Sequence, residues 1–246
     1  MAICSQTAGS DAATKLTVLM LWLLLAAFVV YPLARLLLMA FTADGSFTLA
    51  NLRPFIDSWY DRQAAVNSIL LGCSVGLAGT VLGFIFAYAV TRLSMPKWLK
   101  MAVSAVTLLP LISPPFTSSI ALTLSLGPNG ILLELLGLGN FNSSGFWGTF
   151  ISETLTFFPV AFMTLSTILA RIDPNLEDAA YSLGASSFKV FRSVTLPLAA
   201  PGIANAFLLV FSCSLADFAT PQVLGGHSFP VLPTQAYLQI IGMYDF

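Results

Sequence analysis

Long apolar stretches alternate along this chain with short segments that are polar or rich in Gly and Pro. Five stretches, at residues 16–40, 64–91, 101–125, 146–170 and 198–216, are long enough to cross a bilayer, which takes about 20 apolar residues. Because a helix satisfies its own backbone polar groups in lipid, the pattern predicts an all-α, polytopic transmembrane helix bundle. The first stretch continues to Phe41 without a small-residue cleavage site, so we interpret it as a true span rather than a signal peptide.

The composition excludes a soluble globular protein. Of the 246 residues, 57% are hydrophobic and only 9% are charged, whereas soluble domains carry about 25% charge. The formal net charge of −1 argues against nucleic acid as a partner, since phosphate binding needs a basic face. The three cysteines are widely spaced, unlike those of a disulfide framework or a metal site. We expect a lipid-embedded protein with no metal and no catalytic residues.

Lysine and arginine gather in alternate loops. The N-terminal tail (residues 1–15) and the segments 92–100 and 171–197 hold seven of them, the opposite loops hold two, and one lies near the outer end of the first span. These are Lys15, Arg92, Lys97, Lys100, Arg171, Lys189 and Arg192, then Arg53 and Arg62, and then Arg35. Because cytoplasmic loops carry the positive excess, the tail and both segments are predicted to lie in the cytoplasm.

This orientation leaves residues 217–246 outside the membrane, with Asp245 and Phe246 in the middle of a loop. We therefore expect residues 16–246 to be a truncated transmembrane domain. A sixth span would follow the C-terminus, as in a fragment or the first part of a longer reading frame.

Glycines recur along the second span. Two GxxxG pairs on neighbouring faces, at Gly72, Gly76, Gly79 and Gly83, predict close packing against other helices. Gly72-Cys-Ser74-Val-Gly76 also matches the G-x-S-x-G string of serine hydrolases. That chemistry needs a strand-to-helix turn and a nearby histidine, whereas the string lies within a predicted helix and His227 lies in an outer loop. An intramembrane serine hydrolase is therefore a remote alternative.

Three positions within or beside the spans are candidates for a translocation path. Pro110, in the third span, interrupts the helical hydrogen-bond ladder together with Pro114 and Pro115, as in an unwound stretch beside a cavity or in ordinary proline-containing membrane helices. Glu153 is an ionisable residue inside the fourth span, near its outer end. Asp217 lies at the outer end of the fifth span and faces either a partner or solvent.

The segment 171–197 predicts a short amphipathic helix between two spans. Asp173 is a good N-cap residue, and Pro174 suits the first helical position. Glu177 and Asp178 place negative charge near the positive end of the helix dipole, and Gly184 can end the helix in the left-handed conformation. A narrow apolar stripe follows at i, i+4 and i+7: Leu176, Ala180 and Leu183.

Such a helix either floats on the membrane surface or docks into a groove of a cytoplasmic protein. Surface-lying helices favour Lys and Arg on their polar face, whereas this polar face is acidic and the stripe is small and rich in Ala. These features favour docking.

The same segment resembles the EAA coupling loop of the membrane permeases of binding-protein-dependent ABC importers, whose pattern is E-A-A-x3-G-x9-I-x-L-P. Asp178, Ala179 and Ala180 align with E-A-A, and three residues lead to Gly184. Nine more residues lead to the last part of the pattern, Val194, Thr195, Leu196 and Pro197. The departures are Asp for Glu, with Glu177 just before it, and Val for Ile.

In that family the loop helix lies in a cleft of a cytoplasmic ATPase and passes its motion to the spans. The resemblance thus implies an ATPase-docking role for Glu177, Asp178, Ala179, Ala180, Gly184, Leu196 and Pro197. It extends over roughly residues 60–246 and includes Asn67 at the start of the second span, which we add to the candidate path residues.

The resemblance also implies partners and a location. No G-x-x-x-x-G-K-[ST] motif occurs, so a separate ATPase is expected to bind ATP and Mg²⁺, and this chain is expected to be a transport subunit rather than an enzyme. The implied assembly holds a cytoplasmic ABC ATPase dimer, a second permease half (identical, homologous or fused) and an extracytoplasmic solute-binding protein, in the plasma (inner) membrane of a prokaryote. A passive channel would need no ATPase and would leave the 171–197 segment unexplained.

The stretch from Ser214 to Gly226, followed by Leu232-Pro-Thr, is similar to ferric-iron importer permeases, many of which are double-length chains with two such halves. Polyamine, thiamine and phosphonate permeases share parts of it. Ferric iron is the favoured cargo, and the other three stay open.

Overall fold

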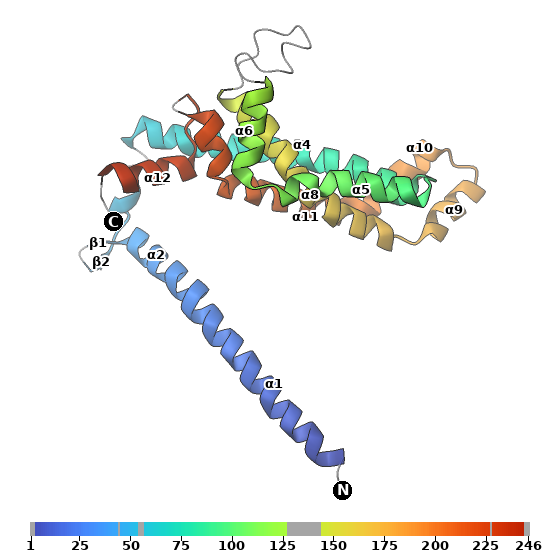
Figure 1. The fold of residues 1–246 in the computed structure, drawn as a ribbon, viewed down its shortest axis with the longest axis horizontal. Helices are drawn as coiled ribbons and strands as arrows, with labels where there is room; N and C mark the ends of the chain where they lie inside the picture. The colour runs from blue at the N-terminus through green and yellow to red at the C-terminus, as the bar shows by residue number, and fades with distance from the viewer. Residues whose placement is uncertain (1–2, 44, 54–56, 127–143, 227, 244–246) are drawn as a thin grey trace. The chain divides into compact units, whose positions relative to one another are not determined.

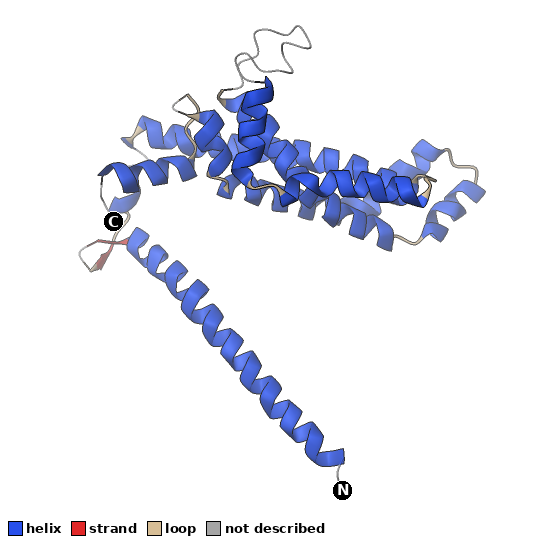
Figure 2. Cartoon of the chain, viewed as in Figure 1, coloured by secondary structure: helices blue, strands red, loops and turns tan. Residues whose placement is uncertain are grey.

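The computed structural model describes residues 3–43, 45–53, 57–126, 144–226 and 228–243, almost all of them helical (Figures 1 and 2). They divide into two compact units, Met1–Trp59 and Tyr60–Phe246. Among the described residues, four helical stretches are long and apolar enough to cross a membrane: Ala13–Phe41, Trp59–Arg92, Phe146–Arg171 and Ser187–Ala216. The predicted all-α membrane bundle is therefore confirmed.

The first unit is one long helical stretch followed by a small hairpin. The stretch consists of α1 (Ile3–Leu25), the π-helical turn η1 (Ala26–Val30) and α2 (Tyr31–Phe41). The strands β1 (Thr42–Ala43) and β2 (Ser46–Phe47) pair antiparallel, and the 3₁₀ turn η2 (Ala50–Leu52) follows them. Asn51 Nδ2 donates to the carbonyls of Met39 and Thr42 at 2.9 and 3.1 Å, which fixes this turn to the end of α2.

The second unit is a bundle of long helices with short elements at both ends (Figure 1). The long helices are α4 (Trp59–Arg92), α5 (Lys97–Ile112), α8 (Phe146–Arg171) and α11 (Leu196–Ala216). At one end lie α9 (Pro174–Ser182), α10 (Ser187–Val190) and the π-helical turn η3 (Phe191–Thr195). Toward the other end lie α6 (Pro115–Leu126), the π-helical turn η4 (Pro221–Gly225) and α12 (Leu232–Met243).

Two of the π-helical turns end two residues before a proline. Pro32 follows η1 and Pro197 follows η3, each at the start of the next α-helix. Proline has no N–H, and its ring clashes with the carbonyl one turn earlier. The wider turn relieves this clash, so the chain continues as a helix through the Leu196-Pro197 step instead of breaking there.

The glycines of α4 bring three helices together. A Cβ on Gly76 would lie 2.8 Å from the Phe207 ring of α11, and one on Gly83 would lie 2.6 Å from Ala161 Cβ and 2.7 Å from Phe162 N of α8. All three distances are too short for a methyl group. The prediction that the GxxxG pairs pack against neighbouring helices is confirmed, with one face on α11 and the other on α8.

The third predicted span differs from the structure. Residues 101–125 do not form one helix, because α5 ends at Ile112 and α6 begins at Pro115. Ser113 is extended (φ −76°, ψ 137°), since a residue before proline avoids the helical region. Residues 217–246 also differ from the predicted outer loop, because η4 and α12 lie within them.

We expect Gly83→Ala to weaken the bundle. The new methyl group would meet backbone atoms of α8, and such overpacking costs about 1–3 kcal/mol of unfolding free energy. Gly242→Ala is the matched control, since the space around Gly242 in α12 is open. Thermal unfolding of the detergent-solubilised chain should show a lower midpoint for Gly83→Ala only. Equal midpoints for the two variants would contradict the close approach of α4 and α8.

Candidate functional site

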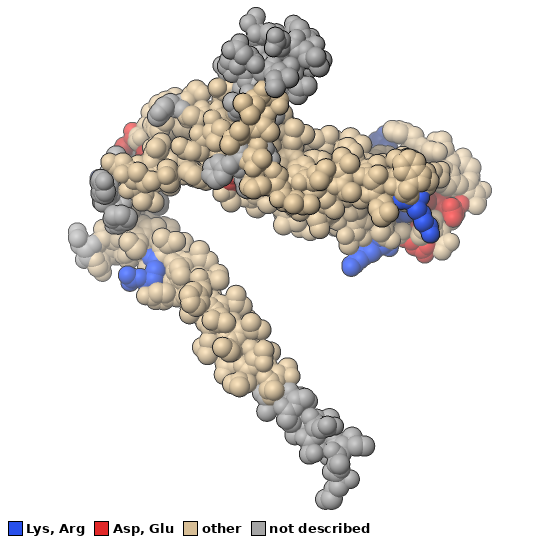
Figure 3. Space-filling view, in the orientation of Figure 1, with Lys and Arg blue, Asp and Glu red and all other residues tan. Residues whose placement is uncertain are grey.

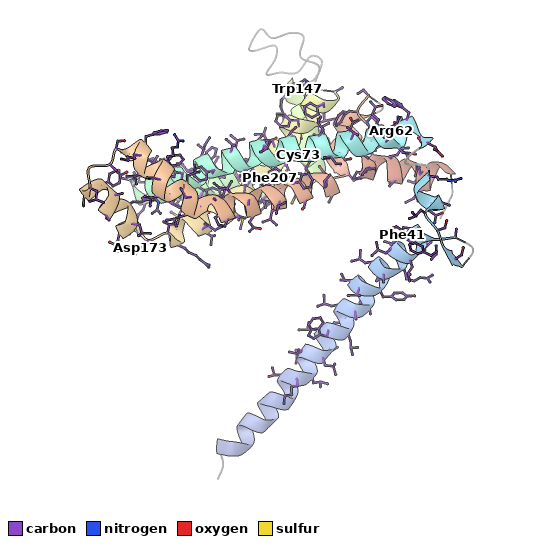
Figure 4. The ribbon with its side chains drawn as sticks, turned by 180° about the vertical axis from the view of Figure 1, so that it is seen from behind. Phe41, Arg62, Cys73, Trp147, Asp173 and Phe207 are labelled. Atoms are coloured by element: carbon purple, nitrogen blue, oxygen red, sulfur yellow. The ribbon has the colours of Figure 1, made fainter. Side chains whose placement is uncertain are left out.

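The helix α9 begins and ends as the sequence predicts. Asp173 caps it with a side-chain oxygen that accepts from Asn175 N at 3.0 Å, and Pro174 takes the first helical position. Gly184 has φ +80°, and the amides of Gly184 and Ala185 bond back to the carbonyls of Tyr181 and Ala180 at 2.9 and 3.1 Å. This pair of bonds is a Schellman motif, so local sequence alone fixes both ends of the helix. Asp173 marks this end of the bundle in Figure 4, and Arg62 lies toward the other.

An ion pair ties α9 to the end of α4. Arg92 Nε lies 3.2 Å from Glu177 Oε1, and both side chains are mostly buried, with 12% and 15% of their surface exposed. The Nε–H is not aligned for a hydrogen bond, so the contact is ionic. Thr195 Oγ1 of η3 donates to the same Glu177 oxygen at 2.7 Å.

The same guanidinium also caps α8. Arg92 Nη2 donates to the carbonyls of Leu169 and Ile172 at 3.1 and 3.3 Å, at the negative end of the α8 dipole. Four elements (α4, α8, α9 and η3) therefore meet at one arginine and one glutamate. We call the contacts of Arg92 and Glu177 with Leu169, Ile172 and Thr195 the Arg92–Glu177 anchor.

Aromatic rings add a second connection between α4 and η3. The Phe191 ring lies edge-on to those of Phe84 and Tyr88, with centroids 6.0 and 5.5 Å apart. Such edge-to-face pairs stabilise beyond the area they bury. The segment after α9 is thus packed on the same helix that carries Arg92.

The opposite face of α9 is uncovered. Leu176 and Leu183 of the predicted stripe are 49% and 89% exposed, and Phe188 just beyond is 71% exposed. Figure 3 shows acidic and basic side chains gathered at this end of the bundle. The predicted docking residues that lie exposed are Asp178, Ala179, Gly184, Leu196 and Pro197, whereas Ala180 is half-buried. The structure places Glu177 mostly buried, with its carboxylate facing the bundle.

Two of the predicted path residues lie together inside the bundle. Glu153 of α8 is fully buried, and Ser214 Oγ of α11 donates to its carboxylate. Asp217 caps the end of α11, is 9% exposed and accepts from Ala219 N at 2.9 Å, and its own N–H donates to the carbonyl of Ser214 at 3.2 Å. The Glu153 side chain thus connects α8 to α11 rather than facing open space.

The other two predicted path residues lie elsewhere. Asn67 Nδ2 donates to Pro230 O at 2.9 Å, and its neighbour Ser68 accepts from Leu232 N at 2.8 Å, so both hold the segment before α12 against α4. Pro110 is a half-buried residue within α5.

The G-x-S-x-G string has helical rather than elbow geometry. Ser74 lies within α4, and its Oγ donates to Leu70 O one turn earlier at 2.7 Å. His227 lies outside the described residues. A serine nucleophile needs a strained strand-to-helix turn, which α4 does not supply at this position.

Sequence reasoning missed Arg92 and Thr195 as parts of the site. It counted Arg92 only as a cytoplasmic charge, and it treated Thr195 as a variable position of the motif. The available signal was the position of Arg92, the last residue of a 34-residue, largely apolar helix, where a guanidinium can cap a neighbouring helix.

Comparisons with known proteins show the family of this chain. The family model described as "binding-protein-dependent transport system inner membrane component" matches residues 79–243. The chain is 36% identical over 226 residues to a putative ferric transport system permease protein, FbpB 1, of Haemophilus influenzae, over 89% of this chain and 35% of that protein. It is 36% identical over 225 residues to the ferric transport system permease protein FbpB of Actinobacillus pleuropneumoniae, over 89% and 32%. The chain thus spans about a third of the length of these relatives.

A solved structure shares the fold. A bacterial ABC transporter involved in the import of alginate aligns with a TM-score of 0.80 at 18% identity, over 98% of this chain and 88% of that one.

Ser214→Ala is expected to destabilise the contact between α8 and α11. It leaves a buried carboxylate oxygen of Glu153 without its donor, which costs about 1–3 kcal/mol. Ser212→Ala is the matched control on the same helix, because Ser212 is exposed and donates only to Leu208 O. Chemical denaturation of the purified chain should separate the two variants. A loss of stability in Ser212→Ala as large as that in Ser214→Ala would show that the Glu153 contact contributes little.

Proposed function

Because this chain belongs to the family of inner membrane components of binding-protein-dependent transport systems, we propose that it is the permease of an ATP-driven importer. In this proposal its spans form part of the path for a small solute, and α9 receives the motion of a cytoplasmic ATPase. The chain itself transports and does not hydrolyse ATP.

The observation that carries this proposal is the position of α9. The helix is fixed to the bundle by Glu177, while Leu176, Asp178 and Leu183 lie exposed on its surface. A helix that floated on lipid would present cations beside its apolar stripe, whereas the exposed acid here is Asp178. A short amphipathic helix held in this way is suited to a groove on a protein.

The charge distribution supports a cytoplasmic position for α9. At the end of the bundle that carries α9, helix α4 ends in Arg92, α5 begins with Lys97 and Lys100, α8 ends in Arg171, and α10 and η3 carry Lys189 and Arg192. Because Lys and Arg accumulate on the cytoplasmic side, we place this end and the N-terminal tail in the cytoplasm. The ATPase dimer would bind at this end, and an extracytoplasmic solute-binding protein would bind at the opposite end. A second permease half, identical, homologous or fused, would complete the path.

Ferric iron is the cargo that we propose. The support is the similarity to two ferric transport permeases at 36% identity. Spermidine/putrescine permeases are similar at a lower level, 28% over 198 residues for PotC of Escherichia coli, so a polyamine is the second candidate. Thiamine and phosphonate stay open as further alternatives.

Leu183→Asp should prevent capture of the ATPase. The Leu183 side chain, just after the last residue of α9, is 89% exposed, and a charge there would have to be buried in the groove, which should lower capture about tenfold or more. Leu93→Asp is the matched control, since Leu93 is an exposed leucine in the segment after α4. The measurement is a mild-detergent pull-down of the full-length native protein with identification of co-purifying chains by mass. If no P-loop ATPase accompanies the native chain, the importer proposal is wrong and the passive channel becomes the better interpretation.

Uptake by cells that carry or lack the native gene should identify the cargo. We expect loss of the gene to lower uptake of radioactive ferric citrate and to leave spermidine uptake unchanged. Excess thiamine or methylphosphonate should not compete with the iron. A fall in spermidine uptake with normal iron uptake would assign the permease to polyamines instead.

A further inference from the structure

We propose that Arg92 and Glu177 are positioning residues that transmit the motion of α9 to α4 and to the end of α8. This inference rests on the proposed function, because it is the ATPase that would move α9. It separates two neighbouring acids that the sequence motif treats together: Asp178 faces the partner, and Glu177 holds the helix that carries it.

The two acids differ because of helix geometry. Successive residues of an α-helix are rotated by about 100° around its axis, so Glu177 and Asp178 face different directions. Glu177 is 15% exposed and contacts Arg92 and Thr195, whereas Asp178 is exposed. When a partner pushes on the exposed face of α9, the contacts of Glu177 with Arg92 and Thr195 on another side of the same turn therefore hold the helix in place.

The backbone segments on either side of α9 do not by themselves transmit its motion to the bundle. Before α9, Ile172 and Asp173 have extended backbones, with ψ 123° and 119°. After α9, Gly184 has φ +80°, and a Cβ at this position would meet nothing within 4 Å. The connection before α9 is two extended residues and the one after it is residues 183–186, so without a side-chain contact the helix could rotate on them.

The Arg92–Glu177 anchor joins α9 directly to α4 and α8 through side-chain contacts. Arg92 is the last residue of α4, and its guanidinium reaches both the Glu177 carboxylate and the final carbonyls of α8. Because guanidinium is a planar fork with several donors, it can hold both at once, which a lysine ammonium does less well. Displacement of α9 is thus delivered to α4 and α8 together, and these helices pack against each other through Gly83.

The first measurement concerns the anchor alone. Arg92→Met removes the guanidinium, and Glu177→Gln removes the charge with little change of shape. Arg171→Met is the matched control, because Arg171 is an exposed arginine at the same end of the bundle. Hydrogen exchange of the amides at 175–183 in the full-length native permease should be about tenfold faster in the first two variants. The double variant should be no faster than either single one, since both remove the same contact.

The second measurement concerns transmission and does not depend on the cargo. The native Cys73 lies half-buried on α4, and its reaction with N-ethylmaleimide can be followed by peptide mass. In the permease–ATPase complex we expect Mg·ATP with vanadate to change this reaction rate. In Arg92→Met and Glu177→Gln the ATPase should still be captured, but the nucleotide-dependent change at Cys73 should be lost.

Three results would overturn the inference. They are unchanged amide exchange at 175–183, a nucleotide response at Cys73 that survives in both variants, and a native Cys73 that does not respond to nucleotide. Absence of any captured ATPase with the native chain would instead overturn the proposed function, and transmission would fail with it. The exchange data would still show whether Arg92 and Glu177 hold α9 in place. Failure of the proposed function is therefore distinguishable from failure of this inference.

Discussion

The close approach of α4 to α8 and α11 is the constraint on which the rest of the second unit depends. Lipid is as apolar as the side chains, so helices in a membrane gain little from apolar burial and associate through close packing. At Gly83 the backbones are so near that an added Cβ would lie 2.7 Å from Phe162 N. This contact sets the positions of the helices along one another. It therefore brings Arg92 to the last carbonyls of α8.

The features predicted correctly from the sequence are those that depend on neighbouring residues. The ends of α9 follow from Asp173, Pro174 and Gly184, each acting within a few positions of itself. The packing role of the α4 glycines was also predictable, because their spacing alone places them on two adjacent helix faces. The break between α5 and α6 at residues 113–114 was only partly predictable from the sequence. Prolines were evident there, but whether neighbouring helices restore a continuous span depends on the three-dimensional environment.

The contacts that the sequence did not predict join residues far apart along the chain. Arg92 meets Leu169 across 77 positions, and Ser214 meets Glu153 across 61. Hydrophobic periodicity shows which face of a helix is apolar, but it does not show which neighbour that face meets or at what height. Glu177 was assigned to the docking surface because it adjoins the motif, whereas its rotation around α9 directs it to Arg92. Position in a motif and direction in space are separate properties.

The uncovered face of α9 also affects how long the protein survives in the cell before it is assembled with its partners. Leu183 and Phe188 are 89% and 71% exposed on the side of the bundle that we assign to the cytoplasm. Exposed apolar side chains of this kind are what chaperones and proteases recognise in incompletely folded chains. If α9 docks into an ATPase as we propose, a permease made in excess over that partner would carry its own degradation signal. The proposed docking face would then also adjust the amount of permease in the cell to the amount of its partner.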